Sequence, residues 1–277
     1  MKKNDILTPI GLVLAIGFIF FAIAQGKGGV GMFIDIPSFL ITVGGSFAAV
    51  LITFDLDTVK RIPSALKMSI VSPSVNKVDL VDQFKELSKI IRKDGILAIE
   101  QQVAEMEDPF LKKGLELIVD GVDAESVKEI LEIELNEKEK VYGSSSKIFK
   151  LWGSYAPAFG MVGTLIGLIQ MLSDMGSPDD IASGMSTALI TTLYGALFTN
   201  MIFNPIGFNI ESKGEKEIEY LEMVVCGLQS IQNGDSVRAM EEKLITHLNE
   251  KDRKAYYENS SREVAESWLV RKKRMMK

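Results

Sequence analysis

Four long stretches of this 277-residue sequence contain no Asp, Glu, Lys, Arg or His. They are Ile6–Ala24, Ile36–Phe54, Leu151–Ser173 and Ile181–Ile210. A hydrocarbon core about 30 Å thick is crossed by roughly 20 helical residues, and each stretch reaches or approaches that length. The sequence therefore predicts an all-α integral membrane protein, with four transmembrane helices in two hairpins and a helical cytoplasmic region. Proteins that move ions through lipid usually keep a carboxylate or histidine in the path, so the charge for any ion transport must come from elsewhere.

Cysteine and histidine occur once each, as Cys226 and His247. A single cysteine excludes an intrachain disulfide and a zinc site with several thiolates, and we interpret Cys226 as a small buried apolar residue. His247 lies on a charged amphipathic segment, without the arrangement of Asp, Ser or Cys that a catalytic base needs. The sequence also lacks a metal-ligand cluster and a phosphate-binding loop. We therefore expect neither an enzyme, nor a metal site, nor a covalently bound cofactor.

Basic residues flank the outer ends of both predicted hairpins and are scarce in their connectors. The connector 25–35 holds one base, Lys27, and the connector 174–180 holds three aspartates and no base. The flanking bases are Lys2, Lys3, Lys60, Arg61, Lys67, Lys147, Lys150, Lys213 and Lys216. Because cytoplasmic loops carry an excess of Lys and Arg, both termini and the central segment are predicted to lie on the cytoplasmic side of the inner membrane. The net charge is −6. The sequence has no concentrated basic face of the kind that binds nucleic acid.

The predicted spans divide the chain into four segments. These are a first hairpin (1–54), a cytoplasmic helical segment (55–146), a second hairpin (147–210) and C-terminal cytoplasmic helices (211–277). Apolar residues at three- and four-residue spacing predict a helix over 78–91. The Asp-Gly pair at 94–95 ends this helix, and the Asp-Pro pair at 108–109 begins another. The Gly-Ser-Ser-Ser run at 143–146 is interpreted as a hinge before the third span.

The third span contains closely spaced glycines and one proline. Gly160, Gly163 and Gly167 predict close packing against another helix, which is the ordinary role of such residues in lipid. Pro157 removes one backbone hydrogen bond and predicts a kink near the cytoplasmic end of the span. A kink of this kind has either a structural or a functional role, and the sequence leaves both open.

Threonines cluster in the second hairpin. Thr187 and Thr191 are four residues apart and share a helix face, Thr192 is adjacent, and Thr164 lies on the other span. Most threonines in membrane helices donate to the carbonyl one turn back. The alternative is that these hydroxyls offer neutral oxygens to a hydrated cation, because hard cations prefer oxygen ligands. Without a carboxylate such a site would be weak.

Several of these motifs together resemble the MotA/PomA family of flagellar stator A subunits. They are A-P-A-F-G-M-V-G-T-L-I-G-L at 156–168, T-T-L-Y-G-A at 191–196, N-P at 204–205, D-I-P-S-F-L at 35–40 and G-G at 44–45. The resemblance covers the whole chain in order, with four spans, a large segment after the second span and a cytoplasmic tail. It implies a motility and chemotaxis protein that generates torque on the flagellar rotor.

The resemblance also implies partners. In the family, five A subunits surround two B subunits of the MotB/PomB type, and each B subunit supplies an ion-binding aspartate in its single transmembrane helix. A carboxylate on the partner would account for the uncharged spans of this chain. The transported ion is H⁺ or Na⁺, and the sequence leaves that choice open.

Particular residues match family positions. Pro157 and Pro205 match two prolines that couple ion passage to motion, and Thr164, Thr191 and Thr192 match positions along the ion path. We add Thr187 to the predicted path because it shares a helix face with Thr191. Tyr194 and Gly195 are neighbours within the same motif, and the resemblance assigns them no role.

A charged contact with the rotor protein FliG is a further expectation from the resemblance. The family has an arginine and a glutamate eight residues apart around a short turn, and Arg92 and Glu100 have that spacing here. The plain alternative is a solvated helix surface. Exposed ion pairs contribute only ~1 kcal/mol each, which suits repeated weak contacts during stepping.

Two other classes compete with this interpretation. Energy-transducing subunits of the ExbB/TolQ type are driven by the proton gradient, but they usually have three spans, so the hairpin Ile6–Phe54 argues against them. A self-sufficient channel or carrier would be expected to hold an ionisable residue within its spans, and none of the four stretches has one.

Overall fold

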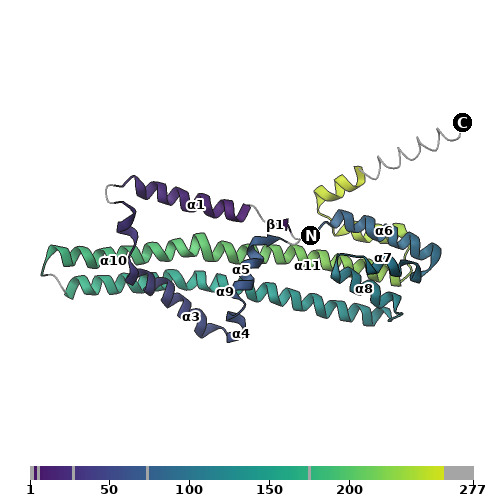
Figure 1. Ribbon diagram of the computed structural model, residues 1–277, viewed down its shortest axis with the longest axis horizontal. Helices are drawn as coiled ribbons and strands as arrows, with labels where there is room; N and C mark the ends of the chain where they lie inside the picture. Colours follow the sequence, from purple (N-terminus) through teal and green to yellow (C-terminus); the bar gives the residue numbers. More distant parts are fainter. Residues whose placement is uncertain (1–2, 5–6, 27–28, 73–74, 174–175, 259–277) are drawn as a thin grey trace. The chain divides into compact units, whose positions relative to one another are not determined.

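The computed structural model describes residues 3–4, 7–26, 29–72, 75–173 and 176–258 (Figure 1). Lys2, Ile6, Lys27 and Asp174, which entered the topology prediction, lie outside these residues. Almost all of the described secondary structure is helical. The exception is an antiparallel pair of two-residue strands, β1 (Lys3–Asn4) and β2 (Val71–Ser72). The all-α prediction is therefore confirmed.

The chain forms two compact units, and each is described by itself. Unit 1 comprises 1–74 and 139–215, and unit 2 comprises 75–138 and 216–277. The segment 55–74, which follows the first hairpin, thus belongs with the apolar helices in unit 1. Two long helices, α9 (Ala124–Ser173) and α11 (Asn204–Gln232), contribute to both units.

The remaining helices fall within one unit each. In unit 1 they are α1 (Leu7–Ala24), the 3₁₀ helix η1 (Val30–Phe33), α2 (Ile36–Phe39), the π-helix η2 (Leu40–Gly44), α3 (Gly45–Thr53), α4 (Leu56–Val59), α5 (Ile62–Ile70), α10 (Pro178–Leu197) and the π-helix η4 (Phe198–Phe203). In unit 2 they are α6 (Lys77–Asp94), the 3₁₀ helix η3 (Ile96–Ile99), α7 (Glu100–Ala104), α8 (Pro109–Val119) and α12 (Val237–Thr246).

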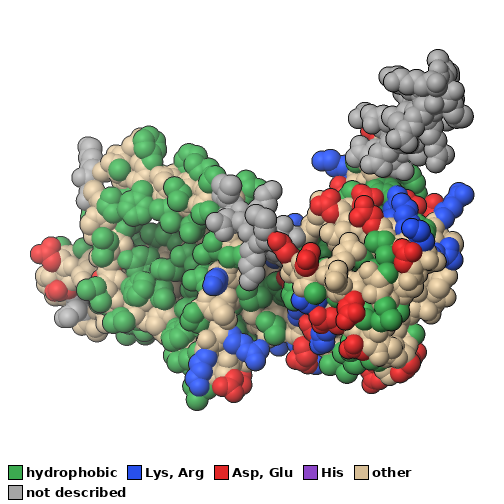
Figure 2. Space-filling view, turned by 45° about the vertical axis from the view of Figure 1, so that its right-hand side comes forward, with side chains coloured by type: hydrophobic (Ala, Val, Ile, Leu, Met, Phe, Trp, Pro, Cys, Tyr) green, Lys and Arg blue, Asp and Glu red, His purple; other side chains and the backbone are tan. Residues whose placement is uncertain are grey.

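Four helical segments among the described residues are long and apolar enough to cross a membrane. They are Leu7–Ala24, Ile36–Thr53, Ala124–Ser173 and Pro178–Gln232. Figure 2 shows hydrophobic side chains over most of the visible surface of unit 1. Phe18 is 70% exposed and Leu165 is 61% exposed, and an apolar surface of this extent needs lipid or protein to cover it. The four predicted spans are confirmed as helices.

Aromatic side chains hold unit 1 together near the start of the third span. The ring of Trp152 stacks on that of Phe203, with the centroids 4.2 Å apart. Phe149 and Ile210 are buried in the same cluster. Burying side chains of this size contributes about 1.5–3 kcal/mol each, so this cluster fixes α9 against the start of α11.

Unit 2 has a separate apolar core. Phe84, Leu115, Leu131 and Leu228 are fully buried and come from α6, α8, α9 and α11. The half-buried Cys226 packs against this core. Charged side chains are scattered over the visible surface of unit 2 in Figure 2, so this unit has the amphipathic build of a water-exposed helical domain.

Local signals set the helix ends in unit 2 as the sequence predicts. Gly95 ends α6 with φ +88°, a left-handed conformation that glycine adopts without strain. The Asp108 carboxylate accepts hydrogen bonds from the backbone N–H groups of Phe110 and Leu111 at 2.9 and 3.2 Å, which caps α8.

The hinge predicted at 143–146 is wrong, because α9 continues through it without a break. Ser145 and Ser146 are buried. A Cβ at Gly214 would lie 2.7 Å from the Cβ of Tyr142, so α11 approaches α9 closely here. Small residues at this place allow two helices to pack together, and this tertiary contact overrides the weak helix propensity of Gly and Ser.

Candidate functional site

The third and fourth spans cross at a point where both carry small residues. A Cβ at Gly167 would lie 2.6 Å from the carbonyl oxygen of Gly184, and one at Gly160 would lie 3.0 Å from that of Thr191. Gly163 faces the side chain of Thr191, and a Cβ there would overlap it. The predicted close packing of the three glycines on a second helix is therefore present, and it brings α9 and α10 backbone to backbone.

Two of the predicted path threonines meet across this crossing. The hydroxyl oxygens of Thr164 on α9 and Thr192 on α10 are 2.5 Å apart. Thr164 Oγ1 also lies 3.1 Å from the carbonyl oxygen of Gly160 and 3.2 Å from that of Ala188. Two hydroxyls hold two protons and four lone pairs, so this pair satisfies itself and still presents oxygen lone pairs at the exposed side of Thr192.

The other two predicted threonines lie elsewhere on α10. Thr191 is fully buried, and its hydroxyl is 3.0 Å from the carbonyl oxygens of both Thr187 and Ala188. It therefore has the common role of a membrane threonine, bonding one turn back. Thr187 is half-buried, and its carbonyl accepts from Thr191. The structure thus brings Thr164 and Thr192 together and places Thr191 behind them.

The second span carries a buried polar stripe that the sequence analysis missed. Ser38, Thr42 and Ser46 are all 0% exposed. The Ser38 hydroxyl donates to the carbonyl of Thr187 at 3.4 Å, and the Thr42 hydroxyl donates to that of Thr191 at 3.3 Å. Their four-residue spacing puts the three on one helix face, and this spacing was the sequence signal that could have identified them.

The end of the stripe at Ser46 reaches the third span. The indole N–H of Trp152 donates to the hydroxyl oxygen of Ser46 at 3.1 Å. Polar side chains that bond across helices act as links where no water competes. The stripe therefore joins α2, η2 and α3 to both neighbouring spans.

Tyr194 anchors the connector between the first two spans. Its hydroxyl donates to the carbonyl of Phe33 at 2.6 Å and accepts from the backbone N–H of Asp35 at 3.1 Å. The Asp35 carboxylate in turn accepts from the N–H of Ser38 at 2.8 Å and caps α2. The tyrosine of the T-T-L-Y-G-A motif thus has a structural role that its sequence position does not reveal.

Pro157 and Pro205 each lie next to a close contact between two helices. Pro157 is inside α9, and Pro205 follows the π-helix η4 at the start of α11. A Cβ at Gly153, one turn before Pro157, would lie 3.0 Å from Cγ of Asn204, the residue before Pro205. On the other side, a Cβ at Gly195 would lie 3.1 Å from Cα of Pro157. Close contacts at glycine residues therefore border both prolines.

Arg92 and Glu100 lie on either side of the turn at Gly95. Arg92 is in the last turn of α6, Glu100 begins α7, and both are exposed. Among the described residues neither has an ion-pair partner. The fully buried Ile99 fixes the turn to the core of unit 2. The turn that carries these two charges is therefore packed on the core of unit 2, and both charges are accessible from solvent.

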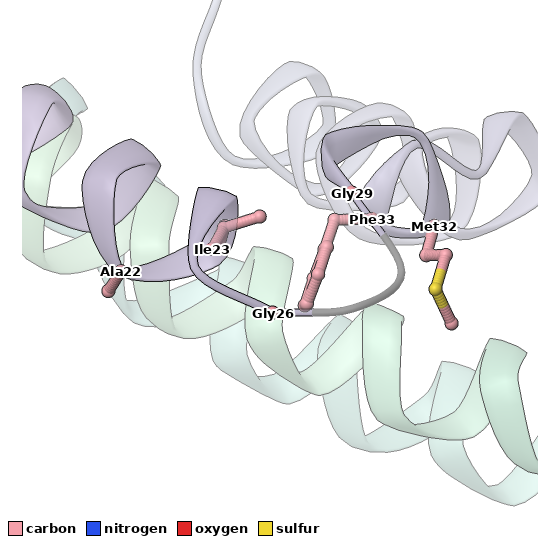
Figure 3. A pocket seen from close by; sticks show the side chains of 6 residues that line it. All are labelled: Ala22, Ile23, Gly26, Gly29, Met32 and Phe33. Atoms are coloured by element: carbon pink, nitrogen blue, oxygen red, sulfur yellow. The ribbon is translucent and has the colours of Figure 1, made fainter.

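The described residues also contain an apolar pocket of about 420 Å³ beside the connector of the first hairpin (Figure 3). It is lined by Ala22, Ile23, Gly26, Gly29, Met32 and Phe33. None of these side chains offers an oxygen ligand to a hard cation. Among all the residues that the structure describes, no group of three or more His, Cys, Asp or Glu could hold a metal ion.

Comparison with known proteins shows which family this chain belongs to. Residues 102–223 match the MotA/TolQ/ExbB proton channel family. The uncharacterized protein YtxD of Bacillus subtilis (strain 168) is 41% identical over 247 residues, which cover 88% of this chain and 91% of YtxD. Motility protein A of Borreliella burgdorferi is 38% identical over 249 residues, which cover 90% of this chain and 96% of that protein. The chain belongs to the MotA/PomA family.

A solved structure agrees with membership of the MotA/PomA family. The flagellar MotAB stator complex from Bacillus subtilis matches with a TM-score of 0.81 and 28% identity, over 91% of this chain and 99% of the matched chain. Because the match covers 91% of this chain, it cannot leave out the whole of the 54-residue first hairpin, the feature that argues against an ExbB/TolQ-type subunit. In this MotA/PomA chain, the candidate sites are the Thr164–Thr192 pair, the two proline sites and the exposed charges at Arg92 and Glu100.

Proposed function

We propose that this chain is the A subunit of a flagellar stator, and that with a MotB/PomB-type B subunit it forms an ion-driven unit that turns the flagellar rotor. The observation that carries this proposal is the similarity to a MotAB stator complex over nearly the whole chain. The uncharged spans support it, because an ion path through them needs a carboxylate from a second protein.

The ion path is proposed to run past the Thr164–Thr192 pair. Neutral hydroxyl oxygens stabilise a cation weakly, and a carboxylate from the B subunit would supply the missing charge. Large apolar residues near the pair are uncovered: Leu165 is 61% exposed and Leu189 is 66% exposed. This surface supports contact with other transmembrane helices, and we propose five A subunits around two B subunits.

Unit 2 is proposed to lie in the cytoplasm and the spans in the inner membrane, with both termini cytoplasmic. The bases Lys60, Arg61 and Lys67 follow the second span and are exposed, which supports this orientation. Unit 2 then presents Arg92 and Glu100 to the rotor protein FliG. Both charges are exposed and lack a partner among the described residues, as a transient electrostatic contact requires.

Reconstitution tests the proposal. The chain purified with its B-type partner is expected to contain more A than B, and to conduct H⁺ or Na⁺ in proteoliposomes. The matched control is the same complex with the partner's transmembrane aspartate replaced by asparagine, which is expected to abolish the flux. Flux through the chain alone would contradict the proposal and would indicate a self-sufficient carrier. A stable complex of one A and one B would contradict the ring.

Swimming cells identify the ion. If the chain uses Na⁺, speed follows external sodium and persists with a protonophore at fixed sodium. If it uses H⁺, speed is independent of sodium and collapses with the protonophore.

A further inference from the structure

Pro157 leaves a gap in the hydrogen bonding of α9. In an α-helix each carbonyl accepts from the N–H four residues later, and proline has no N–H. The carbonyl without its usual donor is that of Gly153, which is buried. A buried backbone carbonyl is almost always paired in a native structure, so a donor from outside α9 is expected here.

Thr199 supplies that donor. Its hydroxyl lies 2.9 Å from the carbonyl oxygen of Gly153, and both groups are buried. Thr199 is in the π-helix η4 on the fourth span. The other threonines of this crossing behave differently, because Thr164, Thr191 and Thr192 each have a carbonyl of their own helix within reach. The hydroxyl of Thr199 instead serves a carbonyl of a different helix.

The surrounding backbone keeps these two groups in place. A Cβ at residue 153 would overlap the side-chain amide of Asn204, so any residue larger than glycine requires that amide to shift. The backbone N–H of Asn204 donates to the carbonyl of Thr199 in the wider turn of the π-helix. At the next turn of α9, a Cβ at Gly195 would lie 3.0 Å from the carbonyl oxygen of Ala156. Close contacts on both sides of the bond therefore limit how α9 can shift without breaking it.

We propose that Thr199 is a positioning residue whose hydroxyl replaces the hydrogen bond that Pro157 removes from α9. The inference rests on the proposed function, in which α9 moves at Pro157 as ions pass. A side-chain hydroxyl rotates away more easily than a helix backbone unwinds, so this bond opens and closes without loss of the helix. Thr199 thereby sets the resting geometry of the third span at Pro157.

A four-variant stability cycle tests the hydrogen bond. It compares the parent chain, Thr199→Val, Pro157→Ala and the double variant, each purified with the B-type partner and followed by thermal unfolding. Thr199→Val is expected to lower the Tm by about 2–4 °C. In the Pro157→Ala background the same change is expected to lower it far less, because residue 157 then donates its own N–H to Gly153. Equal losses in both backgrounds would overturn the proposal.

Motility tests the positioning role separately. Thr199→Val is expected to slow swimming at unchanged membrane level, and Thr199→Ser, which keeps the hydroxyl, is expected to restore the speed. Full speed with Thr199→Val would overturn the positioning role. If the parent chain with its partner neither conducts ions nor supports motility, the proposed function fails, whereas the stability cycle still decides whether the hydrogen bond exists.

Discussion

The hydroxyl of Thr199 donates to the carbonyl of Gly153, four residues before Pro157. A proline in the middle of a helix costs about 3 kcal/mol or more, partly through the hydrogen bond that it removes. Here the fourth span returns a hydrogen bond to the third, so the carbonyl that the proline leaves without a donor is paired at a helix contact. Gly153 and Thr199 make this contact possible, and neither belongs to the motifs by which the family is identified from sequence.

Alanine at residue 153 is expected to destabilise the chain. A Cβ there would overlap Asn204, and overpacking of this kind costs about 1–3 kcal/mol. Gly143→Ala is the matched control, because Gly143 is exposed in the middle of α9 and a Cβ there meets open space. That change should stabilise the helix by about 0.5–1 kcal/mol. Thermal unfolding of both variants measures the contrast, and a lower Tm for Gly143→Ala would restore the hinge interpretation.

Adjacent threonines on α10 are expected to differ in ion flux. Thr192→Val removes an exposed oxygen from the Thr164–Thr192 pair, so flux through the reconstituted complex should fall. Thr191→Val changes a buried hydroxyl that bonds its own helix, so flux should stay near that of the parent. Ion flux in proteoliposomes at equal protein content separates the two. A larger loss with Thr191→Val would move the path to the other side of α10.

Charge reversal at the predicted rotor contact should impair motility without removing the protein from the membrane. Arg92→Glu and Glu100→Lys each reverse an exposed charge that has no partner among the described residues. Each should reduce swimming speed under load. The free energy of unfolding should stay within about 0.5 kcal/mol of the parent value. Lys128→Glu is the control, because the Lys128 side chain in unit 2 is 40% exposed and pairs only loosely with Glu132 at 3.9 Å. Equal effects of all three changes would indicate a general charge effect and no specific contact.

Acid is expected to weaken the contact between α6 and α12. Burial alone raises the pKa of the Glu241 carboxyl, but hydrogen bonds from Lys85 and Tyr256 outweigh it and hold this pKa below its ordinary value of 4.5. Because the folded pKa lies below the unfolded one, the stabilisation is present at neutral pH. It is lost as the pH falls below about 4.5 and through the folded pKa.

Glu241→Gln tests this linkage. The variant should have a lower Tm than the parent at pH 7, and the difference should shrink as the pH falls below about 4. Thermal unfolding across pH 3–7 measures it. Glu250→Gln is the control, because Glu250 is exposed and its ion pair with Lys254 is confined to one helical turn. A constant difference across this range would mean that Glu241 acts through packing alone.

The spans and the helix ends of unit 2 were predictable because their signals are local. Hydropathy marks a span without knowledge of its neighbours, and Asp108 and Gly95 act on their own backbone. The burial of Thr191 and the exposure of Thr192 were not predictable, because α10 is apolar on several faces and only its contact with α9 decides between them. The continuous helix through Gly143 was not predictable either, because it depends on the close approach of α11.

The π-helices η2 and η4 determine which residues of the second and fourth spans face the neighbouring helices. Each holds more residues per turn than an α-helix, so the faces before and after it are offset. Deleting one residue between 198 and 203 would restore a regular α-helix and rotate everything beyond it by about 100°. Phe203 would then leave the ring of Trp152, with which it stacks at 4.2 Å. The number of residues in this turn is therefore as constrained as their identity, and single-residue insertions or deletions there should be tolerated less well than substitutions.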